Sequence, residues 1–216
     1  MRIGIDIDDT VARTQEALIK YALKWDKKYL QGKGIKNPNA YLLMDVFYWT
    51  SEDSAKFFKY AREKKLYKKI KVKSFANFFI NQLYKQGNII IFVTRRNING
   101  PAGDDLTKEW LDKHRFKYHS IIFESINKVK TCLDEKIDYL IDDDIDNINS
   151  LNGTGVKGIL ISNGKNESSN RRVYKDWKEI FEFLSNEWFA KINKICYYYL
   201  AFGELIQIKP YRKQEQ

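Results

Sequence analysis

Three short runs of apolar residues each end abruptly in polar or charged side chains. The first covers residues 3–5, the second residues 88–93 and the third residues 137–141. Nearly continuous apolar runs of this length predict strands that are buried on both faces, as in a parallel sheet. Open sheets of this kind bind ligands at the carboxyl ends of their strands, which is where the polar residues follow.

The segments between and after these runs alternate in predicted type. Apolar residues at helical spacing predict helices over residues 75–86, 104–114 and 176–187, and further strands are expected over residues 120–123 and 156–161. Strands that alternate with helices through short loops form a parallel sheet covered on both faces. The expected fold class is therefore α/β, with a Rossmann-like parallel sheet.

The stretch between the first strand and the helix before the second strand is longer than a simple crossover needs. It is helical in pattern: one helix is expected over residues 15–29, and residues 51–53 predict a cap before a second helix over 55–65. A loop rich in breakers, residues 31–39, separates them. We therefore expect three parts: an α/β core of residues 1–14 and 73–187, a helical insertion of residues 15–72, and a C-terminal extension of unassigned role over residues 188–216.

Composition agrees with one α/β core, for which 216 residues suffice. The chain opens directly on a predicted core strand, so no secretion signal is expected, and Cys132 and Cys196 are expected to be reduced thiols in a cytoplasmic protein. The apolar stretch over residues 195–208 contains Glu204 and is too short to span a membrane. It could form a final strand, a docked helix or a homodimer contact.

Candidate chemistry begins where the first strand ends, at Asp6 and Asp8. Side chains two residues apart on an extended segment share a face, and two carboxylates held close together repel each other. A bound cation or a shared proton would relieve this repulsion. The alternative interpretation is that these acids cap the following helix.

The other strand ends supply complementary groups. The second strand ends at Thr94, the third ends at Asp142 and Asp143, and Lys128 lies 14 residues before Asp142 (142 − 128) at the start of a predicted helix. Each has a simpler alternative, because a threonine often occupies a turn and Lys130 could replace Lys128. The acids at positions 144 and 146 are expected only to favour the start of a helix.

The order of these groups resembles the four motifs of the haloacid dehalogenase superfamily of phosphotransferases. Asp6-x-Asp8-x-Thr10 resembles its first motif, the strand ending in Thr94 its second, Lys128 its third, and Asp142-Asp143 its fourth. Within the superfamily, three features resemble the group of 5′-nucleotidases that includes the cytosolic deoxyribonucleotidases. These features are Val93-Thr94-Arg95, Thr107-x-x-Trp110-Leu111-x-x-His114, and Lys128 ahead of Ile141-Asp142-Asp143.

These residue types fit the hydrolysis of a phosphomonoester. A carboxylate can approach a doubly anionic phosphate only if cations neutralise the site first. Asp6 would attack phosphorus and form an aspartyl phosphate, which water then hydrolyses. Asp8 would protonate the leaving oxygen and then deprotonate the water. This role needs a raised pKa, which we expect proximity to Asp6 to supply unless a bound metal cancels it.

Magnesium is the cofactor that suits this donor set, since it is a hard cation that binds carboxylates and substrate phosphate. The resemblance implies as its ligands the Asp6 carboxylate, the Asp8 backbone carbonyl and Asp143, with Asp142 acting directly or through water. It also implies that Thr94 and Lys128 hold the phosphoryl oxygens. Arg95 is a further candidate for phosphate binding, and Arg96 is equally plausible by position.

Substrate identity would come from the insertion, which resembles the small helical caps that superfamily members carry after their first motif. Its aromatic residues include Phe47 and Trp49, on which a base could stack. The alternative is that a small insertion needs these aromatics for its own core. The resemblance favours a nucleoside monophosphate as substrate, and the runner-up is another small phosphorylated metabolite such as a sugar phosphate.

A formal net charge of +10 adds a different class of function, nucleic-acid binding, including a version in which the pocket acts on the phosphate end of a polynucleotide. Cations alternate with aromatics over residues 24–29 and 62–69, and two more lysines follow within residues 71–73. Surfaces that follow a phosphate backbone have this pattern. Lysines spread among acids are also typical of an ordinary solvated surface, which is the simpler interpretation.

Overall fold

The computed structural model describes residues 1–40, 43–96, 104–166 and 171–202. Its centre is a sheet of six parallel strands in the order β3-β2-β1-β4-β5-β6. The strands are β1 (Arg2–Ile5), β2 (Ile89–Val93), β3 (Ser120–Ile122), β4 (Tyr139–Asp142), β5 (Lys157–Ile161) and β6 (Val173–Tyr174). This sheet confirms the predicted α/β class. The two-residue strand β6 was not predicted, because it is too short to carry a periodic pattern.

The three strands that end in polar residues are neighbours in the sheet. In the register, Ile5 of β1 lies opposite Phe92 of β2 on one side and Ile141 of β4 on the other. The three strands therefore end level with one another, and the residues that follow them meet at one edge.

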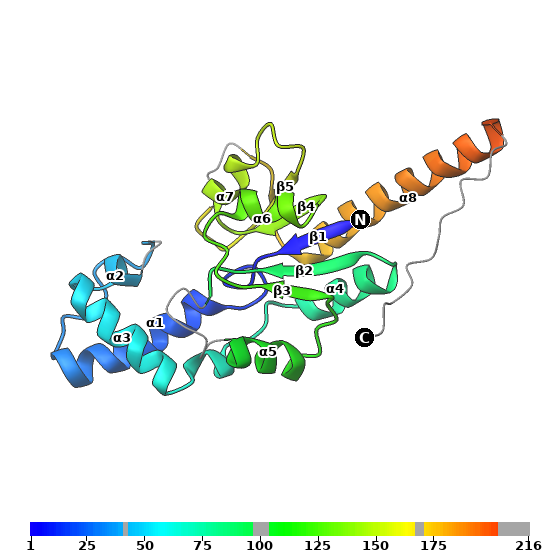
Figure 1. Ribbon diagram of the computed structural model, residues 1–216. Helices are drawn as coiled ribbons and strands as arrows, with labels where there is room; N and C mark the ends of the chain where they lie inside the picture. The colour runs from blue at the N-terminus through cyan, green and yellow to red at the C-terminus, as the bar shows by residue number, and fades with distance from the viewer. Residues whose placement is uncertain (41–42, 97–103, 167–170, 203–216) are drawn as a thin grey trace. The chain divides into compact units, whose positions relative to one another are not determined.

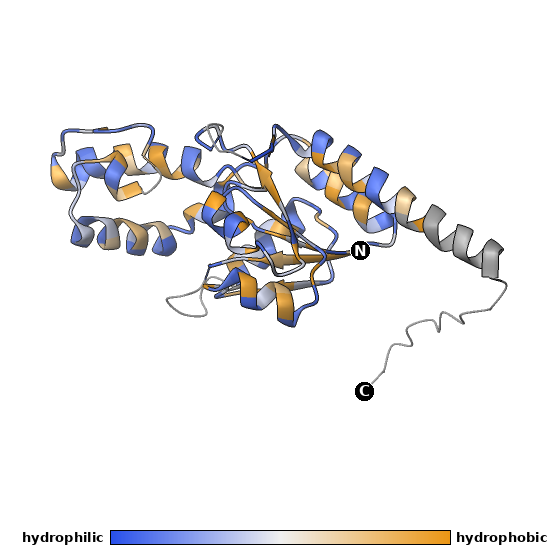
Figure 2. Cartoon of the chain, turned by 90° about the horizontal axis from the view of Figure 1, so that it is seen from above, coloured by the Kyte–Doolittle hydropathy of each residue, from blue (hydrophilic) through white to orange (hydrophobic). Residues whose placement is uncertain are grey.

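Helices cover the sheet on both faces, because alternate strand residues point to opposite sides. Figure 1 shows α6 (Lys128–Asp134) and α7 (Ile145–Ser150) on one side and α4 (Ala76–Lys85) and α5 (Asp104–Lys113) on the other. The α6/α7 face packs Cys132 and Ile148 against Leu140 of β4 and Leu160 of β5. In Figure 2 the strands are mostly hydrophobic, whereas the helices carry both hydrophobic and hydrophilic residues.

The segment between β1 and α4 is helical, as predicted. It contains α1 (Thr14–Trp25), a π-helical continuation η1 (Asp26–Leu30), α2 (Leu43–Val46), α3 (Ser51–Glu63) and a 3₁₀ turn η2 (Leu66–Lys69). Helix α3 begins at Ser51 because Thr50 and Asp53 form a reciprocal capping box. The strand arrows of the sheet point toward α1–α3 (Figure 1), so the carboxyl edge of the sheet faces this helical segment.

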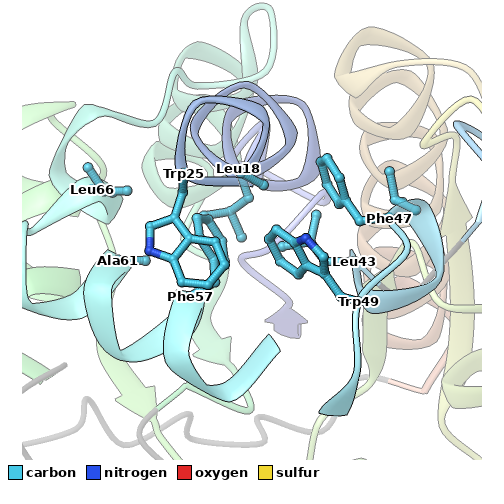
Figure 3. Packing of buried hydrophobic residues seen from close by; sticks show 10 residues of the cluster. Leu18, Trp25, Leu43, Phe47, Trp49, Phe57, Ala61 and Leu66 are labelled. Atoms are coloured by element: carbon cyan, nitrogen blue, oxygen red, sulfur yellow. The ribbon is translucent and has the colours of Figure 1, made fainter. Parts of the chain in front are cut away.

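The helical segment has a hydrophobic core of its own. Trp25 of α1 and Phe57 of α3 point toward Trp49, with ring centroids 5.3–5.7 Å apart (Figure 3). Two antiparallel connections join the segment to the sheet. The backbone N–H of Arg13 donates to Lys71, and that of Lys73 donates to Val11, both at 2.8 Å.

The last helix, α8, runs from Trp177 to Phe202 and is longer than the predicted helix over residues 176–187. The chain divides into two compact units, Met1–Phe181 and Glu182–Gln216, so α8 belongs to both. None of the helices in the described ranges is both long and apolar enough to cross a membrane. The side chain of Cys196 and residues 203–208 lie outside the described part of the chain.

Candidate active site

The site is built around Asp6, the first residue after β1. Its backbone N–H donates to the carbonyl of Ile141 at 2.9 Å, which continues the pairing of β1 with β4. Because Ile5 and Ile141 are register partners, Asp6 and Asp142 follow them side by side at the carboxyl edge. Both carboxylates are buried, with 6% and 1% of the residue surface exposed.

Lys128 lies between these two carboxylates. Its ammonium Nζ is 2.6 Å from Oδ1 of Asp6 and 2.6 Å from Oδ2 of Asp142. Lys128 is the first residue of α6, whose N-cap Asn127 accepts a hydrogen bond from the backbone N–H of Lys130. Burial favours the neutral amine, but the two carboxylates outweigh burial and hold the pKa of Lys128 above its usual value.

Asp143 completes a cluster of three buried carboxylates with Asp6 and Asp142, whose nearest oxygen atoms all lie within 4.8 Å of one another. Thr10 and Asn163 donate hydrogen bonds to the Asp143 carboxylate at 3.2 and 2.8 Å. The backbone N–H of Asp143 donates in turn to the Thr10 hydroxyl at 3.1 Å. Thr10, the third residue of the first motif, therefore fixes the position of the fourth motif.

The donor set of this cluster fits a divalent cation. Burial raises the pKa of Asp6 well above its usual value even though Lys128 opposes the shift, and Asp142, Asp143 and Asp8 raise it further. Burial, with Asp142 nearby, raises the pKa of Asp143 to about 7. Three carboxylates against one ammonium leave an excess of negative charge in a buried site, and oxygen ligands of this kind suit a hard cation such as Mg²⁺.

Asp8 points to a different set of partners. Arg96 donates to both of its carboxylate oxygens, from Nε at 2.9 Å and from Nη2 at 2.6 Å, and the Thr14 hydroxyl donates at 2.6 Å. Burial alone would raise the pKa of Asp8, but the charge and hydrogen bonds of Arg96 hold it below its usual value. The expectation that proximity to Asp6 raises this pKa was therefore wrong, because the nearest charge is a guanidinium.

The three residues that follow β2, Thr94 to Arg96, have side chains with different surroundings. Thr94 is buried at the end of the strand, and its hydroxyl accepts from the backbone N–H of Arg96 at 3.2 Å. The side chain of Arg95 is half exposed and donates to Asn147 at 2.9 Å. Arg96 turns inward instead, with its guanidinium carbon 5.3 Å from the ring centroid of Tyr67.

Two acids close to the site accept hydrogen bonds from backbone N–H groups at the starts of helices. Both oxygens of Asp9 accept from the backbone N–H of Gln15, at 3.1 and 3.2 Å, in the first turn of α1. Asp144 is the N-cap of α7 and accepts from the backbone N–H of Asp146 at 2.9 Å. The prediction that residues 144 and 146 favour a helix start is confirmed.

The two aromatic residues considered for substrate binding lie inside the helical segment. Phe47 is 1% and Trp49 is 8% exposed, and their rings stack on each other with centroids 4.5 Å apart. The indole N–H of Trp49 donates to the buried carboxylate of Asp26. These contacts agree with the alternative that the aromatics form the core of the insertion. The neighbouring Tyr48 is exposed.

Three polar residues were assigned no site role from the sequence. Asn147 donates to Asp142 at 3.0 Å, Asn163 donates to Asp143, and Thr107 accepts from Arg96 at 3.3 Å. Asn163 could have been found, because it follows the apolar strand β5 as Asp6 and Asp143 follow β1 and β4. Asn147 sits on a helix, where no strand end marks it, and Thr107 belongs to a motif of the family resemblance that carried no assigned role.

A family model described as 5′ nucleotidase, deoxy (pyrimidine), cytosolic type C protein matches residues 1–191. A search of curated proteins found no significant match.

Solved structures share the fold at low sequence identity. A predicted phosphatase from Clostridium acetobutylicum is 13% identical, with a TM-score of 0.61, over 86% of this chain and 98% of that one. A HAD-superfamily hydrolase of subfamily IA from Geobacter sulfurreducens PCA is 13% identical, with a TM-score of 0.58, over 85% of this chain and 95% of that one. A hydrolase from Pseudomonas syringae is 13% identical, with a TM-score of 0.55, over 86% and 98% of the two chains. These similarities support the haloacid dehalogenase fold.

Proposed function

The chain belongs to the family of cytosolic type C 5′ nucleotidases, and from this membership we propose that it is a magnesium-dependent phosphatase of nucleoside 5′-monophosphates. One observation carries the proposal: Asp6, Lys128, Asp142 and Asp143 are buried together at the carboxyl ends of β1 and β4. This arrangement offers a nucleophile, a cation for the phosphate, and oxygen ligands for a metal.

Asp6 is the proposed nucleophile. One of its carboxylate oxygens would form a bond to phosphorus while the bond from phosphorus to the leaving oxygen breaks, which yields an aspartyl phosphate. Lys128 already contacts an Asp6 oxygen at 2.6 Å, so its ammonium would lie beside the phosphoryl group transferred there. Its charge would offset the negative charge that gathers on the phosphoryl oxygens, and the Thr94 hydroxyl would donate to one of them.

Asp8 is the proposed acid and base. In the first step it would give a proton to the leaving oxygen, and in the second it would remove a proton from the water that attacks phosphorus and releases Asp6. The pair with Arg96 stabilises the ionised form, which is the form needed for the second step. A dianionic phosphate bound beside Asp8 would favour the protonated form needed for the first step.

Asp6, Asp142 and Asp143 are the side chains that would hold magnesium, and the resemblance adds the backbone carbonyl of Asp8. When bound, the ion would neutralise charge on the phosphate and on the three carboxylates. Thr10 and Asn163 would hold Asp143 in place through their hydrogen bonds.

A cavity of about 220 Å³ lies beside these residues. Four residues form its polar side: Thr14, which donates to Asp8, Asn163, which donates to Asp143, and Asp9 with Gln15. Leu18, Leu43 and Phe58 of the helical segment form its apolar side. We propose that residues 15–72 act as a cap and that the nucleoside part of the substrate packs in this cavity, with the base on Phe58.

The test is a screen of the purified protein with magnesium against nucleoside monophosphates, sugar phosphates and a generic aryl phosphate. The Asp6→Asn protein, purified in parallel, controls for contaminating phosphatases. The proposal expects a nucleoside 5′-monophosphate to give the highest kcat/KM. A sugar phosphate with a higher value would assign the site to another small metabolite, and no hydrolysis of any ester would refute the proposed activity.

A further inference from the structure

A groove of about 250 Å³ lies on the outer side of the helical segment, between α1 and the chain that returns to the sheet. Five cations line it, three from the α1 side and two from the returning chain, with one acid, Glu16, among them. The cations are Arg13, Lys20, Lys24, Lys69 and Lys71. We call this surface the basic groove.

The backbone brings the two sides of the basic groove together. Residues 11–13 leave the sheet and residues 71–73 return to it as an antiparallel pair, with a bridge between Ala12 and Val72. The backbone N–H of Arg13 donates to the carbonyl of Lys71 at 2.8 Å. The cations of the groove therefore face one another because of a fixed backbone contact, although they are far apart in sequence.

The charges within the basic groove are not balanced. Glu16 contacts Lys20 at 2.6 Å and Arg13 at 3.7 Å. Lys24, Lys69 and Lys71 are exposed and have no ion pair with any acid in the described ranges of the chain. Five cations and one acid leave a formal charge of +4 (5 − 1) on one concave surface.

We propose that the basic groove binds the phosphate backbone of single-stranded nucleic acid. A linear polyanion presents successive phosphates, so it can meet several lysines of the groove at once, whereas a mononucleotide brings at most two charges. Tyr21 also lines the groove and offers a ring on which a base can stack.

Each of the three basic segments of the sequence contributes one cation to the basic groove. Lys24, Lys69 and Lys71 come one from each of residues 24–29, 62–69 and 71–73, and the fold places all three in the same groove. None of them contacts the carboxylate cluster at Asp6. Nucleic-acid binding is therefore independent of the proposed hydrolysis, and either can fail without the other.

The test measures the fluorescence anisotropy of a short labelled oligothymidylate over a series of salt concentrations. The triple variant Lys24→Gln, Lys69→Gln, Lys71→Gln removes the unpaired cations of the groove. It should bind at least ~10-fold more weakly at low salt, and the slope of log affinity against log salt should become shallower by about 2, because each phosphate contact on a single strand contributes about 0.7.

A matched control removes the same charge elsewhere. Three exposed lysines lie shortly before β2, β3 and β4, at the edge of the sheet opposite the helical segment: Lys85 is the last residue of α4, and Lys117 and Lys136 lie in the loops before β3 and β4. Replacing these three by glutamine should leave the affinity within about two-fold and the salt slope unchanged. Circular dichroism and hydrolysis of an aryl phosphate should match the unmodified protein for both triple variants.

Three outcomes would overturn the proposal. The first is no salt-dependent binding of the oligothymidylate by the unmodified protein. The second is an equal loss in both triple variants, which would show that net charge alone attracts the strand. The third is equally tight binding of polyglutamate, which would show that the groove accepts any polyanion, an acidic protein included. Single lysine variants, each expected to change the slope by about 0.7, give a graded check.

Discussion

Arg96 holds Asp8 by two hydrogen bonds, from Nε to Oδ2 at 2.9 Å and from Nη2 to Oδ1 at 2.6 Å. This pair joins the end of β2 to the end of β1, across 88 positions of the sequence. Paired hydrogen bonds from a guanidinium fix both the position and the orientation of a carboxylate. Arg96 is thus placed to position the residue that we propose as acid and base.

Replacement of Arg96 by glutamine should lower kcat for a nucleotide by about 10², since general acid–base catalysis contributes this much or more. Hydrolysis of an aryl phosphate should fall less, because its leaving group needs less protonation. The matched control is Arg95→Gln, which removes a half-exposed guanidinium bound to Asn147. If Arg95→Gln lowered kcat more than Arg96→Gln does, Arg95 would instead be favoured as the phosphate-binding arginine.

A double-mutant cycle separates positioning from a general effect of charge. If Arg96 acts through Asp8, Arg96→Gln should cost little further activity in a protein that already carries Asp8→Asn. If the activation free energies lost in the two single variants added up fully in the double variant, this role of Arg96 would be contradicted. The measurement is steady-state kinetics of the single and double variants, on the nucleotide and on the aryl phosphate.

Replacement of Asp6 by asparagine should abolish turnover by several powers of ten while the protein stays folded, because the volume is conserved and the nucleophile is lost. Asp144→Asn is the control, since Asp144 is the N-cap of α7 and asparagine caps helices equally well. Activity of purified, folded protein on an aryl phosphate is the measurement. A folded Asp6→Asn protein that keeps its turnover would refute the mechanism.

Lys128→Ala should lower kcat/KM by ~10² or more, because the site loses the cation nearest the phosphate. It should also destabilise the fold by about 3–5 kcal/mol without metal, since two carboxylates lose their buried partner. Lys130→Ala is the control, as Lys130 forms an exposed pair with Asp134. Denaturant titration and steady-state kinetics test both effects, and equal behaviour of the two variants would reject Lys128.

Removal of metal by a chelator should abolish activity, and magnesium should restore it. Asp143→Ala should sharply raise the magnesium concentration needed for half-maximal activity. Asp142→Ala should raise this concentration by a similar or smaller factor. Asp144→Ala should leave it near the value of the unmodified protein. The reason is that Asp142 and Asp143 belong to the buried cluster, whereas Asp144 caps α7. Equal tolerance at the three positions would leave the cluster without a metal-binding role.

The aromatic residues of the helical segment should separate into structural and substrate-binding groups. Phe47→Ala should destabilise the protein by about 3–5 kcal/mol and affect nucleotide and aryl phosphate alike, because Phe47 is buried. Phe58→Ala should raise KM for nucleotides by about ten-fold, as loss of a stacked base predicts, and spare the aryl phosphate. Tyr48→Ala, at an exposed ring, should change neither stability nor KM.

The sequence by itself determined five of the six strands of the sheet and the residues that follow them. Buried parallel strands are apolar over their whole length, so a carboxylate or hydroxyl directly after one marks the edge where ligands bind. The pattern of apolar runs alone therefore places Asp6, Thr94 and Asp142 on one edge of the sheet. The helical insertion followed in the same way from its periodicity, because a helical pattern is a local property of the chain.

Only the tertiary structure decided which partner each of these side chains meets. Asp8 follows the same strand as Asp6, yet the rotamers of Asp8 and Arg96 and the pairing of β1 with β2 bring it to a guanidinium. The burial of Phe47 and the placement of Lys24 and Lys71 along one groove likewise depend on residues far away in the sequence. Patterns along the chain report a side chain's chemistry and the face it occupies, whereas its neighbours across the fold are set by long-range packing.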